Sequence, residues 1–211
     1  RSIVLQNIFV ITHTESVHHV EQLGGGWYDT PLTEKGKTDA HRVARSLSAQ
    51  VQADALSIFS SDLKRCTDMA AIFQEVFGCT YKADPRLREM SCGSAEGMSR
   101  QWQDMHINPV PANNNRLDHR VFEGAESRRE VGARITRFIE DELAGIDHTA
   151  IVITHGFALT FFIAAWLRIP VEHMDYCEFR STPGGVTHLS QDTLFRNRSL
   201  VGLNATSYLK K

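Results

Sequence analysis

The stretch Ala150-Ile151-Val152-Ile153-Thr154-His155-Gly156, followed by the apolar run 157–167, decides the fold class of this chain. Residues 150–167 contain no Asp, Glu, Lys or Arg, and their number reaches the lower limit of about 17 residues for a membrane-spanning helix. His155-Gly156 interrupts the run, however, and the residues before it are largely β-branched whereas those after it favour a helix. The stretch therefore predicts a buried strand followed by a buried helix.

Similar strands are expected elsewhere in the chain. Residues 7–12 form a continuous apolar run of the kind found in sheets that are covered on both faces. Residues 55–59 and 80–83 predict two more short strands, and 186–189 and 194–203 predict edge strands near the end. Because strands alternate with helical segments, we predict a three-layer α/β/α sandwich with a mostly parallel sheet.

The helices between these strands carry recognisable signals. Residues 40, 43, 44 and 47 are apolar and form one stripe of a helix that begins near Pro31–Glu34. Ser60-Ser61-Asp62 offers N-cap oxygens to the helix expected directly after it. A further helix over 127–143 is expected to stop at Gly145.

Length and composition predict one domain over residues 1–211, with residues 98–123 as a lid or insertion that includes Asn113-Asn114-Asn115. Lys and Arg total 23 and Asp and Glu total 25, so the net charge of −2 argues against nucleic acid as a partner. The four cysteines are too sparse for a disulfide framework, so we expect free thiols in a reducing compartment, the cytoplasm. Because His155-Gly156 interrupts the longest apolar run, we also expect no membrane partner.

Four ionisable side chains fall at or just beyond predicted strand ends. They are His13, Arg65, Glu89 and His155. Ligands of open α/β sheets bind at the carboxyl ends of the strands, so these groups are expected to share one cleft. Two imidazoles, a guanidinium and a carboxyl group suit phosphoryl transfer: one histidine attacks, the cations hold the oxygens, and the carboxyl protonates the leaving oxygen.

Several short motifs carry a family resemblance because they occur in a fixed order along nearly the whole chain. They are T-H-T-E-S at 12–16, W-Y-D-T-P-L-T-E-K-G at 27–36, S-S-D-L-K-R at 60–65, L-R-E at 87–89 with E-G at 96–97, G-A-E-S at 124–127, T-H-G at 154–156 and L-N-A-T-S at 203–207. Together they resemble the histidine phosphatase superfamily, the phosphoglycerate-mutase-like group.

The resemblance implies a metal-free, cofactor-free reaction in two steps on an α/β sandwich. His13 would be the nucleophile that becomes phosphohistidine, and Glu89 would serve as general acid and then general base. Arg65 and His155 would clamp the phosphoryl oxygens. An imidazole nitrogen attacks only when it is neutral, so another hydrogen bond must fix the tautomer of His13.

The chain departs from the family pattern around the nucleophile. Thr12 stands where the family has Arg, Thr14 where it has Gly, and His19 where it often has Asn. A hydrogen bond to a charged group contributes about 1.5–3 kcal/mol. Loss of the arginine contact therefore lowers the rate or affinity by roughly 10–150-fold unless other residues compensate for it. The candidate phosphate ligands are Thr12, Thr14, Ser16, His19, Arg116 and Arg120, with His18 as an alternative imidazole.

These features predict a phosphatase that acts on a small phosphorylated metabolite. The modest lid favours a phosphatase over a phosphomutase. The alternatives are a binding or regulatory protein that has lost catalysis, and a metal-dependent hydrolase that uses His13, His18, His19 and a carboxylate. The second alternative lacks a known ligand spacing. A homodimer is compatible with the sequence, which does not specify the oligomeric state.

Overall fold

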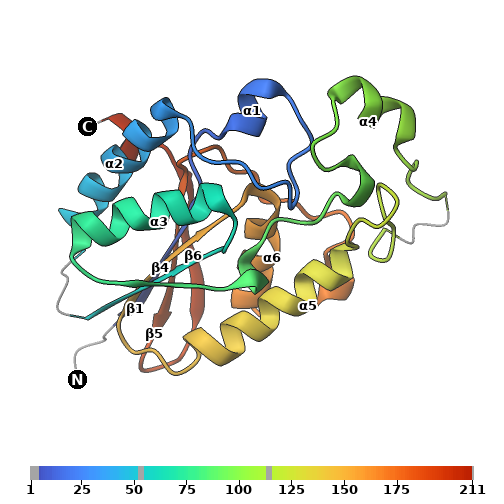
Figure 1. The fold of residues 1–211 in the computed structure, drawn as a ribbon. Coiled ribbons are helices and arrows are strands. Elements are labelled where there is room, and N and C mark those ends of the chain that lie inside the picture. Colours follow the sequence, from blue (N-terminus) through green and yellow to red (C-terminus); the bar gives the residue numbers. More distant parts are fainter. Residues whose placement is uncertain (1–4, 52–54, 113–115, 211) are drawn as a thin grey trace.

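The computed structural model describes residues 5–51, 55–112 and 116–210, and it contains a six-stranded sheet in the order β3-β2-β4-β1-β5-β6 (Figure 1). The strands are β1 (Leu5–Thr12), β2 (Leu56–Ser60), β3 (Tyr81–Ala83), β4 (Thr149–Thr154), β5 (Val186–Asp192) and β6 (Arg198–Ala205). The predicted α/β class is therefore confirmed, and the strand of residues 150–154 occupies an interior position between β2 and β1.

The direction of the strands is mixed. β3, β2, β4 and β1 pair in parallel, β5 pairs antiparallel to β1, and β6 pairs antiparallel to β5. Only β5 thus runs against the other five strands. The expectation that residues 186–189 form an edge strand is wrong, because β5 lies between β1 and β6 and its Val186 and Leu189 are buried.

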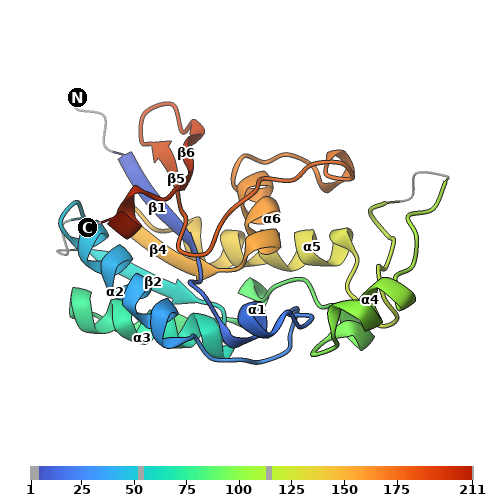
Figure 2. The same ribbon diagram turned by 90° about the horizontal axis from the view of Figure 1, so that it is seen from above.

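Helices cover both faces of the sheet. α2 (Glu34–Ser48) and α3 (Lys64–Phe77) pack on one face, and α5 (Arg128–Phe138) and α6 (Gly156–Trp166) pack on the other (Figures 1 and 2). One apolar cluster joins the strands to α2 and α3, and a second joins them to α5 and α6. Together they give the three layers that the alternating pattern predicts.

The apolar run after His155-Gly156 forms α6, whose side chains are buried on nearly all sides. The charge-free stretch is thus divided between the interior strand β4 and a helix of 11 residues. Among the described residues, no helix combines the length and the apolar character needed to cross a bilayer.

The helix boundaries correct one prediction from the sequence and confirm another. Leu63, rather than Ser60-Ser61-Asp62, precedes the first turn of α3, because Ser60 still belongs to β2. The helix over 127–143 begins with Ser127 as its N-cap and continues beyond α5 as a π-helical turn, Ile139–Leu143. Ala144 is the C-cap of this turn, so Gly145 directly follows the cap, where the sequence predicts that it stops the helix.

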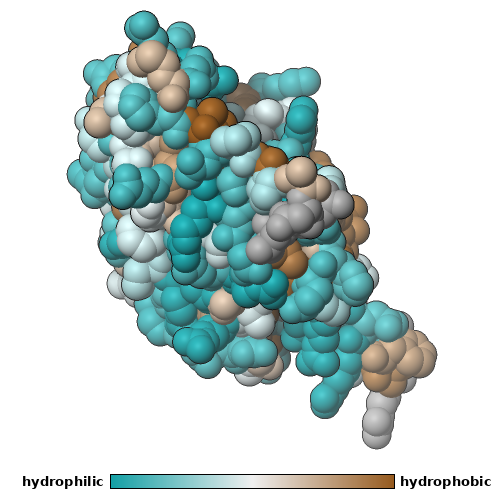
Figure 3. Space-filling view, turned by 90° about the vertical axis from the view of Figure 1, so that its right-hand side faces the viewer, coloured by the Kyte–Doolittle hydropathy of each residue, from teal (hydrophilic) through white to brown (hydrophobic). Residues whose placement is uncertain are grey.

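Short helices surround the end of the sheet at which β1 and β4 finish. α1 (Val17–Glu21) follows the first strand, and α4 (Arg100–His106), which has no buried residue, lies in the expected lid. Asn113-Asn114-Asn115 lies outside the described residues. The face that carries α4 is mostly hydrophilic with small separate hydrophobic patches (Figure 3). Single helical turns complete the fold at Pro85–Leu87, Gly93–Ala95, Val171–His173 and Ser207–Lys210.

Candidate active site

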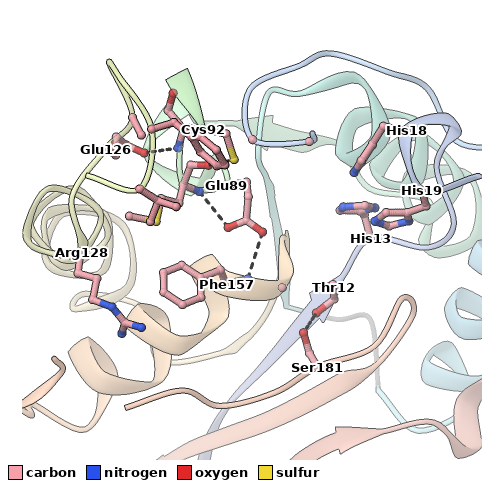
Figure 4. A pocket seen from close by; sticks show the side chains of 18 of the residues that line it. Thr12, His13, His18, His19, Glu89, Cys92, Glu126, Arg128, Phe157 and Ser181 are labelled. Carbon is pink, nitrogen blue, oxygen red and sulfur yellow. Dashed lines mark hydrogen bonds between the residues drawn. The ribbon is translucent and has the colours of Figure 1, made fainter. Parts of the chain in front are cut away.

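A cavity of about 580 Å³ opens at the carboxyl end of β1 (Figure 4). Thr12 and Thr154 are register partners at the ends of β1 and β4, and the backbone N–H of His13 donates to the carbonyl of Thr154 at 2.9 Å. The cavity wall includes His13, Arg65 and Glu89, so three of the four predicted ionisable groups meet there.

His13 is held as a neutral imidazole. Its Nδ1 lies 2.8 Å from the carbonyl oxygen of Thr14, which can only accept, so Nδ1 carries the hydrogen and Nε2 keeps its lone pair. Burial and, next, the Arg65 guanidinium hold the pKa of His13 well below its usual value. The protonation state that an attacking imidazole requires is therefore built into the site.

Arg65 is a buried cation that projects from the first turn of α3 and is only 1% exposed. Its Nε donates to Nε2 of His13 at 3.2 Å, and its two terminal nitrogens donate to the carbonyls of Tyr28 and Gly26 at 3.0 and 2.7 Å. Within the described residues it forms no salt bridge with a carboxylate. A buried charge without a counterion is costly, so this position favours an anionic ligand.

Glu89 faces the cavity from the opposite side (Figure 4). Its carboxylate accepts hydrogen bonds from the backbone N–H groups of Phe157 at 3.1 Å and Ala158 at 2.9 Å, in the first turn of α6. The N–H of Met90 is a third donor, at 2.9 Å. These donors fix the position of the carboxylate.

The loop that carries Glu89 is anchored from behind by Arg134 of α5. One terminal nitrogen of Arg134 donates to the Glu89 carbonyl at 2.9 Å, and the other donates to the carbonyls of Arg86 and Arg88. Glu126 in turn pairs with Arg134 at 2.8 Å. The turn Gly124–Ser127 therefore positions the candidate acid indirectly.

His155 lies beside His13 but is not on the cavity wall. It is fully buried, its Nε2 is 2.8 Å from the Ser61 hydroxyl oxygen, and its ring meets that of His13 edge-on at 5.1 Å between centroids. Burial is the main reason why the pKa of His155 is well below its usual value. In this structure, His155 therefore supports His13 from behind rather than presenting a nitrogen to the cavity.

Two further imidazoles, His18 and His19, extend the wall next to His13. The His19 ring stacks on that of His13 with centroids 5.3 Å apart, and His18 Nδ1 lies 3.0 Å from the hydroxyl oxygens of Ser16 and Thr30. Burial lowers the pKa of His19. Burial and, next, the neighbouring His19 charge lower the pKa of His18 to about 3. No group of three or more His, Cys, Asp or Glu among the described residues has a metal-binding arrangement.

The remaining predicted phosphate ligands divide into two groups. Thr12 and Arg116 line the cavity, and the Thr12 hydroxyl donates to Ser181 Oγ at 2.9 Å. Thr14, Ser16 and Arg120 do not line it, which corrects the prediction. The Thr14 hydroxyl donates to the Gly36 carbonyl at 2.7 Å, Ser16 is buried beneath His18, and Arg120 pairs with Glu130 at 2.7 Å.

Sequence reasoning missed several residues of the wall. The principal ones are Cys92, Phe122, Arg128, Phe157 and Ser181. Arg128 directly follows the G-A-E-S turn and Phe157 directly follows T-H-G, so proximity to these motifs is the signal that could have found them. Ser181 lies in a loop with no comparable pattern.

The comparisons with known proteins agree with this geometry. The profile of the histidine phosphatase superfamily (branch 1) matches residues 8–201. The chain is 30% identical over 174 residues to the probable phosphoglycerate mutase GpmB of Yersinia enterocolitica, covering 77% of this chain and 75% of that protein.

Solved structures of similar proteins have the same fold as this chain. The mycobacterial glucosyl-3-phosphoglycerate phosphatase in complex with VO3 superimposes with a TM-score of 0.80 and 26% identity, over 95% of this chain and 100% of that one. Bacillus stearothermophilus YhfR, at 24% identity and a TM-score of 0.76 over 97% and 99% of the two chains, shares the fold. The chain belongs to the histidine phosphatase superfamily.

Proposed function

We propose that this protein hydrolyses a small phosphomonoester, without a metal ion, through a phosphohistidine formed on Nε2 of His13. The observation that carries the proposal is the pairing of a neutral imidazole with the buried, uncompensated guanidinium of Arg65 at 3.2 Å. The imidazole supplies a nucleophile and the guanidinium supplies charge for the phosphoryl oxygens.

The reaction has two balanced steps. His13 Nε2 attacks phosphorus, the bond between phosphorus and the ester oxygen breaks, and the departing oxygen takes a proton from the Glu89 carboxyl group. Water then attacks the phosphohistidine while the Glu89 carboxylate takes one of its protons, the N–P bond breaks, and inorganic phosphate leaves. Glu89 ends the cycle protonated, as it began.

We propose that His19, with His18 beside it, takes over part of the role of the arginine that Thr12 replaces. The His19 ring lies against the nucleophile and on the cavity wall. A neutral imidazole can donate one hydrogen bond to a phosphoryl oxygen, which is a weaker contact than a bidentate guanidinium. We therefore expect slower turnover than an arginine-containing site would support.

The choice of phosphatase over phosphomutase rests on the lid, because the names of similar proteins point both ways. The mycobacterial neighbour with 26% identity is named a phosphatase, whereas the relative with 30% identity carries a probable mutase name. The expected lid, residues 98–123, contains only one short helix among its described residues, so water can reach the phosphoenzyme more easily than under a full enclosure.

Phosphoenzyme trapping tests the proposal. The protein is mixed with radiolabelled acetyl phosphate and quenched in alkali, where phosphohistidine persists, and in acid, where it is lost. We expect an alkali-stable, acid-labile label that maps to His13 and is unaffected by a chelator. His13→Asn should abolish the label, whereas His148→Asn, a matched change of a histidine bonded to Ser57 outside the cavity, should retain it.

Each contrary outcome identifies another function. Labelling that a chelator abolishes would support the metal-dependent hydrolase. Phosphate or vanadate binding with neither a label nor turnover would support the binding or regulatory protein. Transfer of the label to an added acceptor alcohol in preference to water would support the mutase.

A further inference from the structure

A second hollow, of about 800 Å³, lies between α5 and the end of α6, and none of the described residues lines both it and the catalytic cavity. We name it the arginine groove, because four arginines line it: Arg129, Arg137, Arg168 and Arg198. We propose that the arginine groove binds an organic anion, a small molecule that joins an oxyanion group to an apolar body. This inference goes beyond the proposed function and does not depend on it.

The wall of the arginine groove combines positive charge with apolar surface. Arg129 is neutralised by Asp118 at 2.7 Å and Glu172 at 3.2 Å. The other three arginines form no salt bridge with a carboxylate of the described residues, and Glu140 is the one carboxylate among the described residues of the wall. Small-molecule sites are typically of this size, apolar over much of their surface and equipped with a few polar groups. The apolar part includes Ile139, Ala165, Ile169, Pro170 and Val171.

Arg168 occupies a backbone conformation that favours glycine. It directly follows Leu167, the C-cap of α6, and its φ is 57°. Its N–H donates to the Ala165 carbonyl at 3.2 Å, and the N–H of Ile169 donates to the Ala164 carbonyl at 2.9 Å, which are the two bonds of a Schellman motif. Glycine is the usual residue at this position, because a Cβ is disfavoured at positive φ. Strained non-glycine residues cluster at ligand sites, and the strained residue here contributes a guanidinium to the groove.

Arg198, at the start of β6, is held rigidly in the same groove. Its Nε donates to the side-chain oxygen of Gln191 at 3.0 Å, its Nη1 donates to the Trp166 carbonyl at 3.1 Å, and its guanidinium stacks on the Trp166 ring at 4.4 Å. These contacts leave Nη2 without a hydrogen-bond partner among the described residues. A cation that is already fixed in place loses little conformational entropy when it binds an oxyanion.

The two arginines lie close enough to affect each other. Burial and, next, the charge of Arg168 lower the pKa of Arg198, so the two cations repel each other. An oxyanion bound between them would offset this repulsion and would accept charge-assisted hydrogen bonds from both guanidinium groups. The charges of the groove therefore complement an anion.

A second backbone irregularity borders the arginine groove. The π-helical turn Ile139–Leu143 follows α5, and Ile139, Glu140 and the C-cap Ala144 line the groove. Single π-helical turns are rare and occur frequently at functional sites. The π-helical turn and the left-handed Arg168 thus lie at the ends of two neighbouring helices and shape the same hollow, which favours a ligand site over an ordinary solvated surface.

Equilibrium binding of three naphthalene compounds to the full chain tests the inference. They are 2-naphthoate, 2-naphthylphosphonate and 2-naphthylmethanol, which share one apolar body and contain no phosphate ester that the protein could hydrolyse. We expect at least one of the two anions to bind more tightly than the neutral alcohol by about 10-fold or more, as measured by calorimetry. The anion with the larger gain identifies the oxyanion as a carboxylate or a phosphoryl group.

Arg168→Gly and Arg196→Gly form a matched pair of variants. Arg196 also has a positive φ, of 59°, but it does not line the arginine groove. Both changes relieve the same backbone strain, so neither should lower the urea midpoint of unfolding. Arg168→Gly should reduce the preference for the anion to less than about 3-fold, whereas Arg196→Gly should keep it in full. Arg198→Gln should reduce it as Arg168→Gly does.

Three results would overturn the inference. The first is equal affinity of the wild-type protein for all three compounds. The second is a preference for the anion that survives both Arg168→Gly and Arg198→Gln, which would place the bound anion elsewhere, as in the catalytic cavity. The third is an equal loss of preference in Arg168→Gly and Arg196→Gly, which would reduce the effect to general charge. Phosphohistidine trapping is a separate measurement, so the hydrolase and the groove can each fail without the other.

Discussion

The ends of β1 and β4 are nearly identical in sequence but differ in what they present. Both finish with Thr-His, their threonines are register partners, and the two imidazoles lie 5.1 Å apart. His13 continues into a loop and lines the cavity, whereas His155 leads directly into α6 and is fully buried. Position at the end of a strand thus brings a residue to the site, and the segment that follows decides whether it faces the ligand.

The hydrogen-bond partners of the two rings differ accordingly. A backbone carbonyl fixes Nδ1 of His13 and leaves Nε2 toward Arg65, whereas Nε2 of His155 is occupied by Ser61. Only His13 also lines the cavity, where a bound oxyanion can replace its Nε2 as the acceptor of the Arg65 N–H. Under the proposed function, His13 then attacks and His155 holds it in place.

The largest effect is expected at His13. His13→Ala should lower kcat by at least about 10⁴-fold because it removes the nucleophile. His155→Asn should lower kcat by about 10–100-fold and should still form phosphoenzyme, because it disturbs only the position of His13. Steady-state kinetics with 4-nitrophenyl phosphate, combined with phosphoenzyme trapping, measure both effects. Equal losses in the two variants would show that His155 contacts the reacting group.

A second effect is expected at Glu89 and depends on the leaving group. Glu89→Gln should slow hydrolysis of an alkyl phosphate such as glycerol 3-phosphate by about 10²–10⁴-fold, because the alkoxide needs a proton. With 4-nitrophenyl phosphate, whose leaving group is stable as an anion, the loss in the phosphorylation step should be much smaller. Single-turnover rates of phosphoenzyme formation provide the measurement, and equal losses would remove Glu89 as the acid.

Substitutions of the paired threonines, Thr12 and Thr154, are expected to have smaller effects, on KM and on stability respectively. The Thr154 hydroxyl donates to the buried Leu87 carbonyl at 2.8 Å, so Thr154→Val should cost about 1–3 kcal/mol of unfolding free energy. The Thr12 hydroxyl bonds Ser181 on the cavity wall, so Thr12→Val should act mainly on KM. Urea unfolding and steady-state kinetics on both variants test the contrast. A KM effect confined to Thr154→Val would contradict it.

The most gradual effect is the dependence of stability on pH. The folded protein lowers the pKa of His13, His18 and His155, whereas in the unfolded chain these values return to about 6.5. Below that pH the unfolded state binds more protons than the folded state, so stability falls as pH falls, by up to about 1.4 kcal/mol per pH unit for each group.

Urea unfolding at pH 7.5 and pH 5.5 measures this loss. His18→Asn should lose less stability than the wild type over the same interval, because one of the histidines with a lowered pKa is gone. An identical loss in the two proteins would show that His18 does not contribute.

Much of the fold was predictable because the signals were local. The apolar runs before His13 and after Gly156 could be buried in few other ways. The interior place of β5 was not predictable, because its alternating pattern does not distinguish an edge strand from one paired on both sides. Within the site, residues next to strand ends were found. Thr14 and Arg120 were misjudged because their partners, the Gly36 carbonyl and Glu130, are fixed only by tertiary contacts.

The order of strands also has a consequence for synthesis. β1 is made first, yet its two neighbours, β4 and β5, begin only at residues 149 and 186. On the ribosome, both edges of this apolar strand stay open until β4 and β5 have emerged, which makes the nascent protein prone to aggregation. A chain that stops before residue 186 lacks one of the two strands that flank β1, so the cavity at the end of β1 is completed long after the segment that carries His13 has been made.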